Sequence, residues 1–379
     1  MKIFIPEFNS KLVNLIFELE KLKNKKLGGT THPLVFFQLK EIFHIMESIG
    51  SARIEGNNTT IAEYFEKEIE RNNKKDEKFI EILNSKKALT FIDKNIDTFK
   101  IDKLFISEIH KIVVDRLSPP PQGEGSNNPG EYRKSNTKIN KSKHRPVDYV
   151  QVSGYVDDLI DFINEESDEK YNLIKVALVH HKFVWIHPFD NGNGRAVRLL
   201  TYAMLIKYGY NINVGRIINP TAVFCSDREK YYNALASADK FHDKDIEKWC
   251  EYVLSGLKRE VEKTYKLADY RFLKENILIP ALEISLEKKI IKEDEFKILK
   301  IAVEKQVFQL SDIIKCFPEM AKVSLSRKIK RLKDKKMILS ETKNSRKYVL
   351  CFNNSYLYRG IIRKLDENNF LPIKGETIA

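Results

Sequence analysis

The chain has little cysteine, and this excludes two common ways of stabilising a fold. Its 379 residues include only four cysteines, with no CxxC pair and no Cys/His cluster: Cys225, Cys250, Cys316 and Cys351. A zinc site or a disulfide framework needs ligands or pairs at recognisable spacing, so neither is indicated. A chain of this length has ample apolar sequence to bury a core, and we expect two or more domains.

Long apolar runs and a targeting pattern are also lacking. No apolar stretch reaches membrane-spanning length without charges. The first residues, Met1 to Glu7, have no signal-peptide pattern. We therefore expect a cytoplasmic protein with reduced cysteines. The Pro/Gly-rich stretch 118–130 is interpreted as a loop within a domain and not as a linker.

What the chain does have is a dense cluster of glycine, asparagine and arginine in residues 187–198, HPFDNGNGRAVR. It separates two strongly apolar stretches, 171–186 and 199–206, which we expect to be buried helices. Gly192-Asn193-Gly194 can turn successive N–H groups toward one point. The helix that begins there adds its free N–H groups and its dipole. With His187 as a group that can take a proton near neutral pH, the run predicts a polyphosphate held beside a general base.

Two arginines strengthen this interpretation over simpler ones. Arg195 and Arg198 are three residues apart, so we expect them to project from one side of the first helical turn. A plain helix–loop–helix turn is an alternative, because Asn-Gly pairs form turns. A calcium loop starting at Asp190 would need glycine at its sixth place and glutamate at its twelfth, and the chain has Arg195 and Thr201 there. A Walker loop would need GKS or GKT after its glycines.

The same run resembles the signature of the Fic family (filamentation induced by cAMP), HPFx(D/E)GNGRxxR. The resemblance implies a mainly α fold, a Fic-type helical core with a small β-hairpin flap, that moves AMP from ATP onto a protein hydroxyl. By the resemblance, His187 is the base for that hydroxyl and Phe189 anchors the loop in the core. It also implies a set of phosphate-binding residues: Gly192, Asn193, Gly194, Arg195 and Arg198.

One place departs from the signature. The family's metal-binding acid falls on Asn191, whose amide oxygen can ligate Mg²⁺ but brings no charge, whereas Mg²⁺ prefers carboxylates and phosphates. Our prediction is that Asn191 is the Mg²⁺ ligand and that the ATP phosphates supply most of the negative charge. The alternative is a one-place shift of the loop that makes Asp190 the ligand.

A second element lies far away in the sequence. Ser51-Ala52-Arg53-Ile54-Glu55-Gly56 follows a helical stretch expected over 34–49 and resembles the family's inhibitory motif, (S/T)xxxE(G/N). The resemblance implies that Ser51, Glu55 and Gly56 form an inhibitory segment that precedes the core. A glutamate placed against Arg198 would pair with it bidentately. The arginine would then be unavailable to the γ-phosphate of ATP.

Residues 130–146 predict a short, basic hairpin. Its parts are 130–133, 137–140 and 144–146. It resembles the family's flap, which holds the target segment by adding a strand. An ordinary surface hairpin is the alternative.

Tyr231-Tyr232-Asn233-Ala234-Leu235 resembles a stretch that lines the family's adenine and ribose pocket. The resemblance implies that Tyr231 and Tyr232 contact the nucleotide. The alternative is a pair of aromatic core residues on a helix, and we expect this alternative to hold for one of the two tyrosines.

Much of the net charge of +13 lies near the C-terminus, where residues 321–348 contain eleven Lys and Arg against Asp334 and Glu341. We expect helices over 293–304, 310–317 and 322–335, and strands over 337–341 and 347–352. That order predicts a winged helix-turn-helix whose recognition helix carries Ser324, Ser326, Arg327, Lys328 and Lys330. Its charge could neutralise DNA phosphates. The alternative is a winged helix used for protein contacts.

These patterns predict three segments: an N-terminal helical region (1–100), a catalytic core with connecting helices (101–290) and the winged helix-turn-helix (291–379). We predict an ATP- and Mg²⁺-dependent protein adenylyltransferase that modifies a Ser, Thr or Tyr hydroxyl and is inhibited by Glu55. Two alternatives are an enzyme that removes AMP and a DNA-binding regulator that senses nucleotide. No membrane partner is expected, and a homodimer is left open.

Overall fold

The computed structural model of the protein describes residues 1–24, 31–70, 76–139, 143–210, 219–353 and 357–371. The fold is mainly helical with one small antiparallel sheet, which confirms the predicted mainly α fold. The contacts divide the chain into two compact units. The first unit is Met1–Lys25 with His44–Glu262, and the second unit is Lys26–Phe43 with Lys263–Ala379. Among the described residues, no helix combines the length and apolarity needed to cross a membrane.

The first unit is built from helices. They are α1 (Lys11–Asn24), the second half of α2 (Pro33–Glu55), α3 (Ile61–Glu70), α4 (Glu77–Asn95), α5 (Lys103–Val114), η1 (Tyr149–Gln151), α6 (Val152–Asn164), η2 (Glu169–Tyr171), α7 (Asn172–Ile186), α8 (Asn193–Lys207), α9 (Thr221–Cys225), α10 (Arg228–Ala238) and most of α11 (Asp243–Ala268). Aspartates begin several of them. The Asp102 carboxylate accepts from the Phe105 N–H at 2.8 Å, and Asp76 and Asp227 cap α4 and α10 in the same way.

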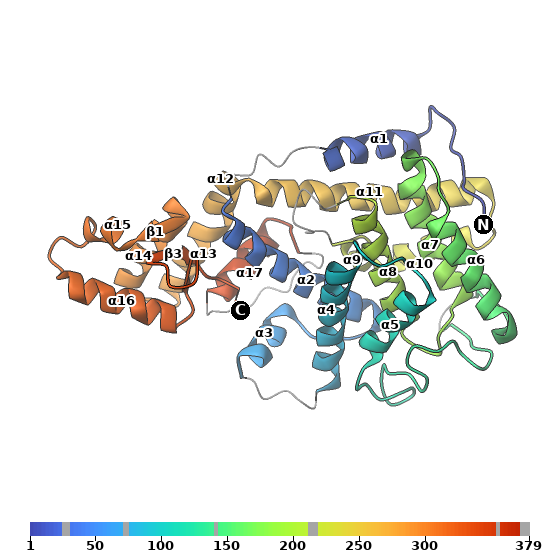
Figure 1. The fold of residues 1–379 in the computed structure, drawn as a ribbon, viewed down its shortest axis with the longest axis horizontal. Coiled ribbons are helices and arrows are strands. Elements are labelled where there is room, and N and C mark those ends of the chain that lie inside the picture. The colour runs from blue at the N-terminus through green and yellow to red at the C-terminus, as the bar shows by residue number, and fades with distance from the viewer. Residues whose placement is uncertain (25–30, 71–75, 140–142, 211–218, 354–356, 372–379) are drawn as a thin grey trace. The chain divides into compact units, whose positions relative to one another are not determined.

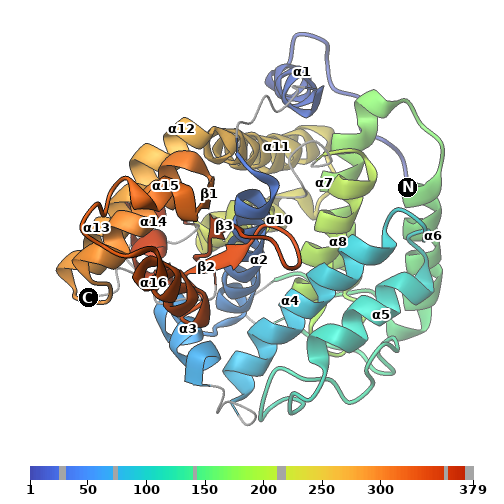
Figure 2. The same ribbon diagram turned by 60° about the vertical axis from the view of Figure 1, so that its left-hand side comes forward.

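Two helix pairs position the candidate site. The helices α7 and α8 pack side by side, as do α4 and α5, and α8 also contacts both α4 and α5 (Figures 1 and 2). Nearly every residue of α7 and α8 is buried, as expected for helices that are apolar on all sides. The loop between α7 and α8 therefore joins two deeply buried helices.

The second unit contains the small sheet. Besides the first half of α2 and the end of α11, its elements are α12 (Tyr270–Leu273), the π-helical η3 (Lys274–Leu278), α13 (Ile279–Glu287), α14 (Glu293–Lys305), β1 (Val307–Gln309), α15 (Leu310–Ile314), α16 (Lys322–Asp334), β2 (Ile338–Ser340), β3 (Lys347–Leu350) and α17 (Tyr358–Glu367). The strands pair antiparallel in the order β1-β3-β2, with Phe308 opposite Tyr348 and Leu339 opposite Val349. From α14 to β3 the elements run helix, strand, helix, helix, strand, strand, so the three helices and two strands expected there are present, while the winged helix-turn-helix itself stays a prediction. The sequence did not predict β1.

The expected flap hairpin differs from the structure. No strand forms in 130–139 or 143–147, and residues 140–142 lie outside the described part of the chain. The side chain of the buried Arg133 forms hydrogen bonds with main-chain carbonyls of this segment. Its Nη1 donates to Ser135 O at 3.0 Å, and its Nη2 donates to Val147 O. Because a side chain already satisfies these main-chain acceptors, ladder pairing is not needed to bury this segment.

Candidate active site

The loop between α7 and α8 is closed by its own polar groups. His187 ends α7 in the left-handed conformation, with φ of 54°, and Gly192 has φ of +74° just before α8 begins at Asn193. The Asn193 amide bonds both main-chain groups of Phe189: Phe189 N donates to Oδ1 at 2.9 Å, and Nδ2 donates to Phe189 O at 2.8 Å. The side chain of Asn193 is therefore committed to the loop, and only its main-chain N–H remains for an anion.

Phe189 is fully buried, as the sequence predicted. Its ring stacks on His110 with centroids 3.7 Å apart. The Gly130 N–H donates to Nδ1 of His110 at 2.9 Å, so Nε2 carries the proton and donates to Asn191 O at 3.0 Å. Sequence reasoning missed His110, because a lone histidine on a helix with no motif around it is not distinctive.

His187 is half-buried at the end of α7. Burial lowers its pKa to about 4, so the imidazole is neutral near pH 7 and can accept a proton. The main-chain oxygen of His187 accepts from Nε of Arg133 at 2.9 Å. Arg133 thus braces the residue from the loop where a flap was expected.

The contact between the 51–56 segment and Arg198 is present. The helix α2 runs through Glu55 and ends at Gly56, which has φ of +109°. Arg198 Nη2 lies 2.7 Å from Glu55 Oε1, and Arg198 Nε donates to Ser51 Oγ at 2.9 Å. Burial raises the pKa of Glu55, but the Arg198 charge and hydrogen bond outweigh it and hold the pKa below its usual value. The carboxylate is therefore charged at neutral pH.

Glu55 also fills the space above the first turn of α8. A Cβ atom at Gly194 would lie 2.2 Å from Glu55 Oε1 and 3.0 Å from Arg198 Nη1. The absence of a side chain at Gly194 thus lets an anionic group approach the start of α8 and Arg198 together. In this structure the group is the Glu55 carboxylate, and a phosphate has the same charge sign and acceptor geometry.

Arg195 differs from the expectation that it would act beside Arg198. Its side chain is fully buried. Nη1 donates to Val113 O at 3.3 Å and Nη2 to Glu124 O at 2.5 Å. The same nitrogens lie 3.5 Å from Glu81 Oε1 and 3.4 Å from Glu124 Oε2. These contacts pair both terminal nitrogens of the guanidinium with the chain's own oxygens, and this gives Arg195 a structural position. Its buried Nε has no hydrogen-bond partner among the described residues.

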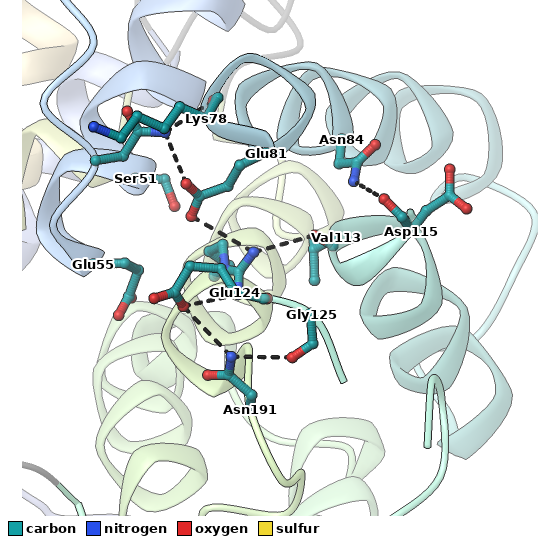
Figure 3. Close-up of polar contacts among 12 residues, drawn as sticks. Ser51, Glu55, Lys78, Glu81, Asn84, Val113, Asp115, Glu124, Gly125 and Asn191 are labelled. Atoms are coloured by element: carbon teal, nitrogen blue, oxygen red, sulfur yellow. Dashed lines mark hydrogen bonds and ion pairs between the residues drawn. The ribbon is translucent and has the colours of Figure 1, made fainter. Parts of the chain in front are cut away.

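Glu81 and Glu124 are the carboxylates that sequence reasoning missed (Figure 3). Glu81 is 2% exposed, and Asn57 Nδ2 donates to its Oε2 at 2.8 Å. Burial raises the pKa of Glu81, and the Arg195 charge and the Asn57 hydrogen bond oppose that rise. Glu124 is half-exposed and comes from the 118–130 loop.

Asp190 does not take the place of the missing acid. Its Oδ1 accepts from Ser126 Oγ at 2.5 Å and its Oδ2 from Asn127 N at 3.0 Å. These bonds tie it to the 118–130 loop, and they argue against the shifted metal site. Asn191 Nδ2 donates to Gly125 O at 3.0 Å and lies 3.4 Å from Glu124 Oε2. Within the described ranges, no group of three His, Cys, Asp or Glu side chains is placed to hold a metal alone.

The two tyrosines of α10 have different environments. Tyr231 is buried, and its hydroxyl lies 2.9 Å from Nε2 of His180. Tyr232 is 42% exposed, with the Arg228 guanidinium 5.5 Å from its ring centre. Tyr231 is thus the core residue of the pair. Tyr232 is the one whose ring is accessible to a ligand.

Together these features define a helical domain with a glycine-containing turn at a buried helix start, a carboxylate paired to Arg198 and a neutral histidine across the same loop. Residues 100–205 match the Fic/DOC family. Over these residues the chain is similar to proteins of the Fic family.

Curated relatives show a similarity to the same family. The chain is 29% identical over 202 residues to the protein adenylyltransferase Fic of Drosophila willistoni, covering 52% of this chain and 36% of that protein. It is 28% identical over 228 residues to the protein of the same name from Aedes aegypti, covering 58% of this chain and 41% of that protein. The chain therefore spans less than half the length of these relatives.

Solved structures of low identity support the fold. A Fic family protein from Desulfovibrio desulfuricans G20 superposes with a TM-score of 0.57 at 17% identity, over 92% of this chain and 98% of that one. A Fic domain containing signaling protein from Bacteroides thetaiotaomicron has a TM-score of 0.54 at 20% identity, over 68% of this chain and 98% of that one.

Proposed function

We propose that the protein transfers AMP from ATP to a Ser, Thr or Tyr hydroxyl of a target protein and that Glu55 inhibits this transfer. One observation carries the proposal: a carboxylate paired to Arg198 fills the position over Gly194 where an outer phosphate of ATP would lie. The relatives named protein adenylyltransferase support the same reaction.

In the proposed reaction, neutral His187 takes the proton of the target hydroxyl as its oxygen attacks the α-phosphorus. The bond from that phosphorus to the bridging oxygen breaks, and pyrophosphate leaves. Main-chain N–H groups at 192–194 stabilise the charge on the transferred phosphate. Arg198 holds the outer phosphates once Glu55 is displaced, and Tyr232 borders the nucleoside.

The donor set fits ATP at Gly192, Gly194 and Arg198, and it fits less well at Arg195, whose two terminal nitrogens already bond chain oxygens. A divalent cation would be held near Asn191, and it would neutralise phosphate charge. Glu55 inhibits by occupying Arg198, since one guanidinium group cannot pair fully with a carboxylate and a phosphate at once.

Incorporation of label from [α-³²P]ATP tests the proposal. The Glu55→Gly protein should label itself or a target more than the parent does, and the Glu55→Gly/His187→Ala protein should lose about 100- to 10,000-fold of that rate. ATP binding should persist in the double variant, because the anion-binding turn is unchanged. Equal labelling by the parent and Glu55→Gly would contradict the inhibitory role. Undiminished labelling by the double variant would contradict the mechanism.

The second unit supports an additional candidate function, contact with DNA phosphates through α16. Lys328 and Lys335 pair with Asp294 and Glu295, but other basic side chains of α16 are exposed: Lys322, Arg327, Lys330, Arg331 and Lys333. Duplex binding that weakens steeply with salt, and weakens further in Arg327→Ala/Lys330→Ala, is expected. A Lys170→Ala/Lys248→Ala protein serves as control for general charge. Binding equal in both variants would contradict the contact of α16 with DNA.

A further inference from the structure

The residue at the acidic place of the motif is an amide, and a carboxylate from another part of the chain lies beside it. Glu124 belongs to the 118–130 loop, and its Oε2 is 3.4 Å from Asn191 Nδ2. Figure 3 shows the contacts of Asn191 with Glu124 and Gly125. The negative charge that the motif lacks at position 191 is therefore present one side chain away.

The surroundings of Asn191 favour an amide while Glu124 is a carboxylate. Its Nδ2 faces two acceptors, Gly125 O at 3.0 Å and Glu124 Oε2, which fixes the orientation of the amide group. Its Oδ1 accepts no hydrogen bond from the described residues and is left for another partner. An aspartate here would place a carboxylate oxygen against the carbonyl and a second carboxylate, and like charges at this separation repel.

The position of Glu124 is fixed by its main chain, while its side chain can adjust. Arg195 Nη2 bonds Glu124 O, and Asp190 holds the next turn of the loop through Ser126 and Asn127. The Glu124 side chain is 44% exposed. Glu81 lies against Arg195 from the buried side and neutralises its positive charge. The carboxylate of Glu124 is therefore not needed to neutralise Arg195 and can pair with another cation.

We propose that Glu124 supplies the carboxylate ligand for the divalent cation that accompanies the nucleotide, with Asn191 Oδ1 as its neutral neighbour. Mg²⁺ binds oxygens at about 2.1 Å in octahedral geometry, which puts adjacent ligands about 3 Å apart. Asn191 Nδ2 and Glu124 Oε2 are already 3.4 Å apart, so the two side chains are neighbours, and a rotation of the exposed Glu124 side chain would bring its carboxylate toward an ion held by Asn191 Oδ1. This inference rests on the proposed function for the presence of the nucleotide.

Cation binding is measured without turnover in the full chain carrying Glu55→Gly. The probe is Mn²⁺, followed by electron paramagnetic resonance, with the α,β-methylene analogue of ATP, which cannot transfer AMP. Glu124→Gln should raise the Mn²⁺ concentration for half-saturation by at least about 10-fold, since even groups that only orient a ligand contribute about 10- to 100-fold. Asn191→Asp alone should not tighten binding, because its new charge faces Gly125 O and Glu124.

The decisive variant exchanges the two groups. Glu124→Gln/Asn191→Asp restores one carboxylate and one amide in contact, so its half-saturation should return to within about threefold of the Glu55→Gly protein, a coupling that a double-mutant cycle isolates. Glu131→Gln, an exposed carboxylate later in the same connection, is the matched control and should change nothing. Binding of the analogue without metal should be equal in all variants, which checks the fold.

Three results would overturn the proposal: an unchanged midpoint in Glu124→Gln, tighter Mn²⁺ binding in Asn191→Asp alone, or a loss in Glu124→Gln that the exchange does not restore. The titration stays informative if no target is ever labelled. In that case the proposed AMP transfer fails, while the assignment of the cation ligand is judged by the Mn²⁺ data.

Discussion

Arg195 and Arg198 lie one turn apart at the start of α8, and both are almost completely buried. Their partners differ. Arg195 bonds two main-chain carbonyls and lies against Glu81, whose side chain is 3% exposed. Arg198 bonds Ser51 and Glu55 at the end of one helix, and the Glu55 side chain is 26% exposed. Residue type and burial of an arginine therefore do not tell whether its contact is permanent.

Whether such a contact is permanent depends on the solvent exposure of the glutamate that pairs with the arginine. If the Arg198 contact opens, Glu55 can turn into water and Arg198 can bind a phosphate, so both charges stay solvated or paired. If the Arg195 contact opens, Glu81 remains buried without its cation, which is costly. We infer that the Arg198 contact can exchange with a ligand and that the Arg195 contact belongs to the scaffold.

The largest expected effect is on stability, from Arg195→Ala. Losing one partner of a buried pair costs about 3–5 kcal/mol, and here it also leaves the Val113 and Glu124 carbonyls without their donor. Both tryptophans, Trp185 and Trp249, lie in the first unit, so urea unfolding followed by tryptophan fluorescence reports on that unit.

The control is Arg116→Ala, an exposed arginine paired to Asp115, which should change stability by less than about 1 kcal/mol. Arg195→Ala unfolding no more easily than Arg116→Ala would remove the scaffold role.

Arg198→Ala should cost less stability and more ligand affinity. Its hydrogen bonds to Ser51 and Glu55 involve a charged group, so their loss costs about 1.5–3 kcal/mol, and Glu55 can turn to solvent. Calorimetry in the Glu55→Gly background should show ATP binding weakened in Arg198→Ala. If Arg198→Ala destabilises as much as Arg195→Ala, the two contacts do not differ in kind.

The sequence could predict the Arg198 contact but not the Arg195 contact. The motif spacing indicated His187, the Gly192–Gly194 turn and Arg198, and the resemblance of 51–56 to an inhibitory motif placed Glu55 against that arginine. These features are short and contiguous, so their chemistry can be identified in a single stretch.

What the sequence could not predict depended on contacts between distant segments. Arg195 bonds Val113 and Glu124, which are 82 and 71 residues away, and no spacing rule links them. The expected hairpin in 130–146 failed because the Arg133 side chain satisfies the carbonyls. Likewise β1, with three residues, is too short to produce a recognisable alternation.

Ser51→Ala should give a smaller change on the exchangeable side. It removes the hydroxyl that accepts from Arg198 Nε at 2.9 Å, at a cost of about 0.5–1.5 kcal/mol. Since 1.36 kcal/mol is tenfold in an equilibrium, basal labelling should rise by at most about tenfold and stay below that of Glu55→Gly. Labelling at or above the Glu55→Gly level would mean that Ser51, not Glu55, carries the inhibition.

The smallest expected effect is on pH dependence, and it separates the base from the two arginines. Burial lowers the pKa of His187 from 6.5 to about 4, and the Glu55 charge acts in the opposite direction, so removing Glu55 lowers it further. The folded protein thus keeps neutral His187 down to about pH 4, while the unfolded chain takes up its proton near 6.5. Stability linked to this group is present above pH 6.5 and is lost as the pH falls toward 4.

Labelling by Glu55→Gly, measured at saturating ATP, should change less than about twofold from pH 8 to pH 6. A base with the ordinary pKa would lose roughly three quarters of its neutral form at pH 6, so a fourfold fall in rate over that range would show that His187 titrates normally and that its burial does not set its charge.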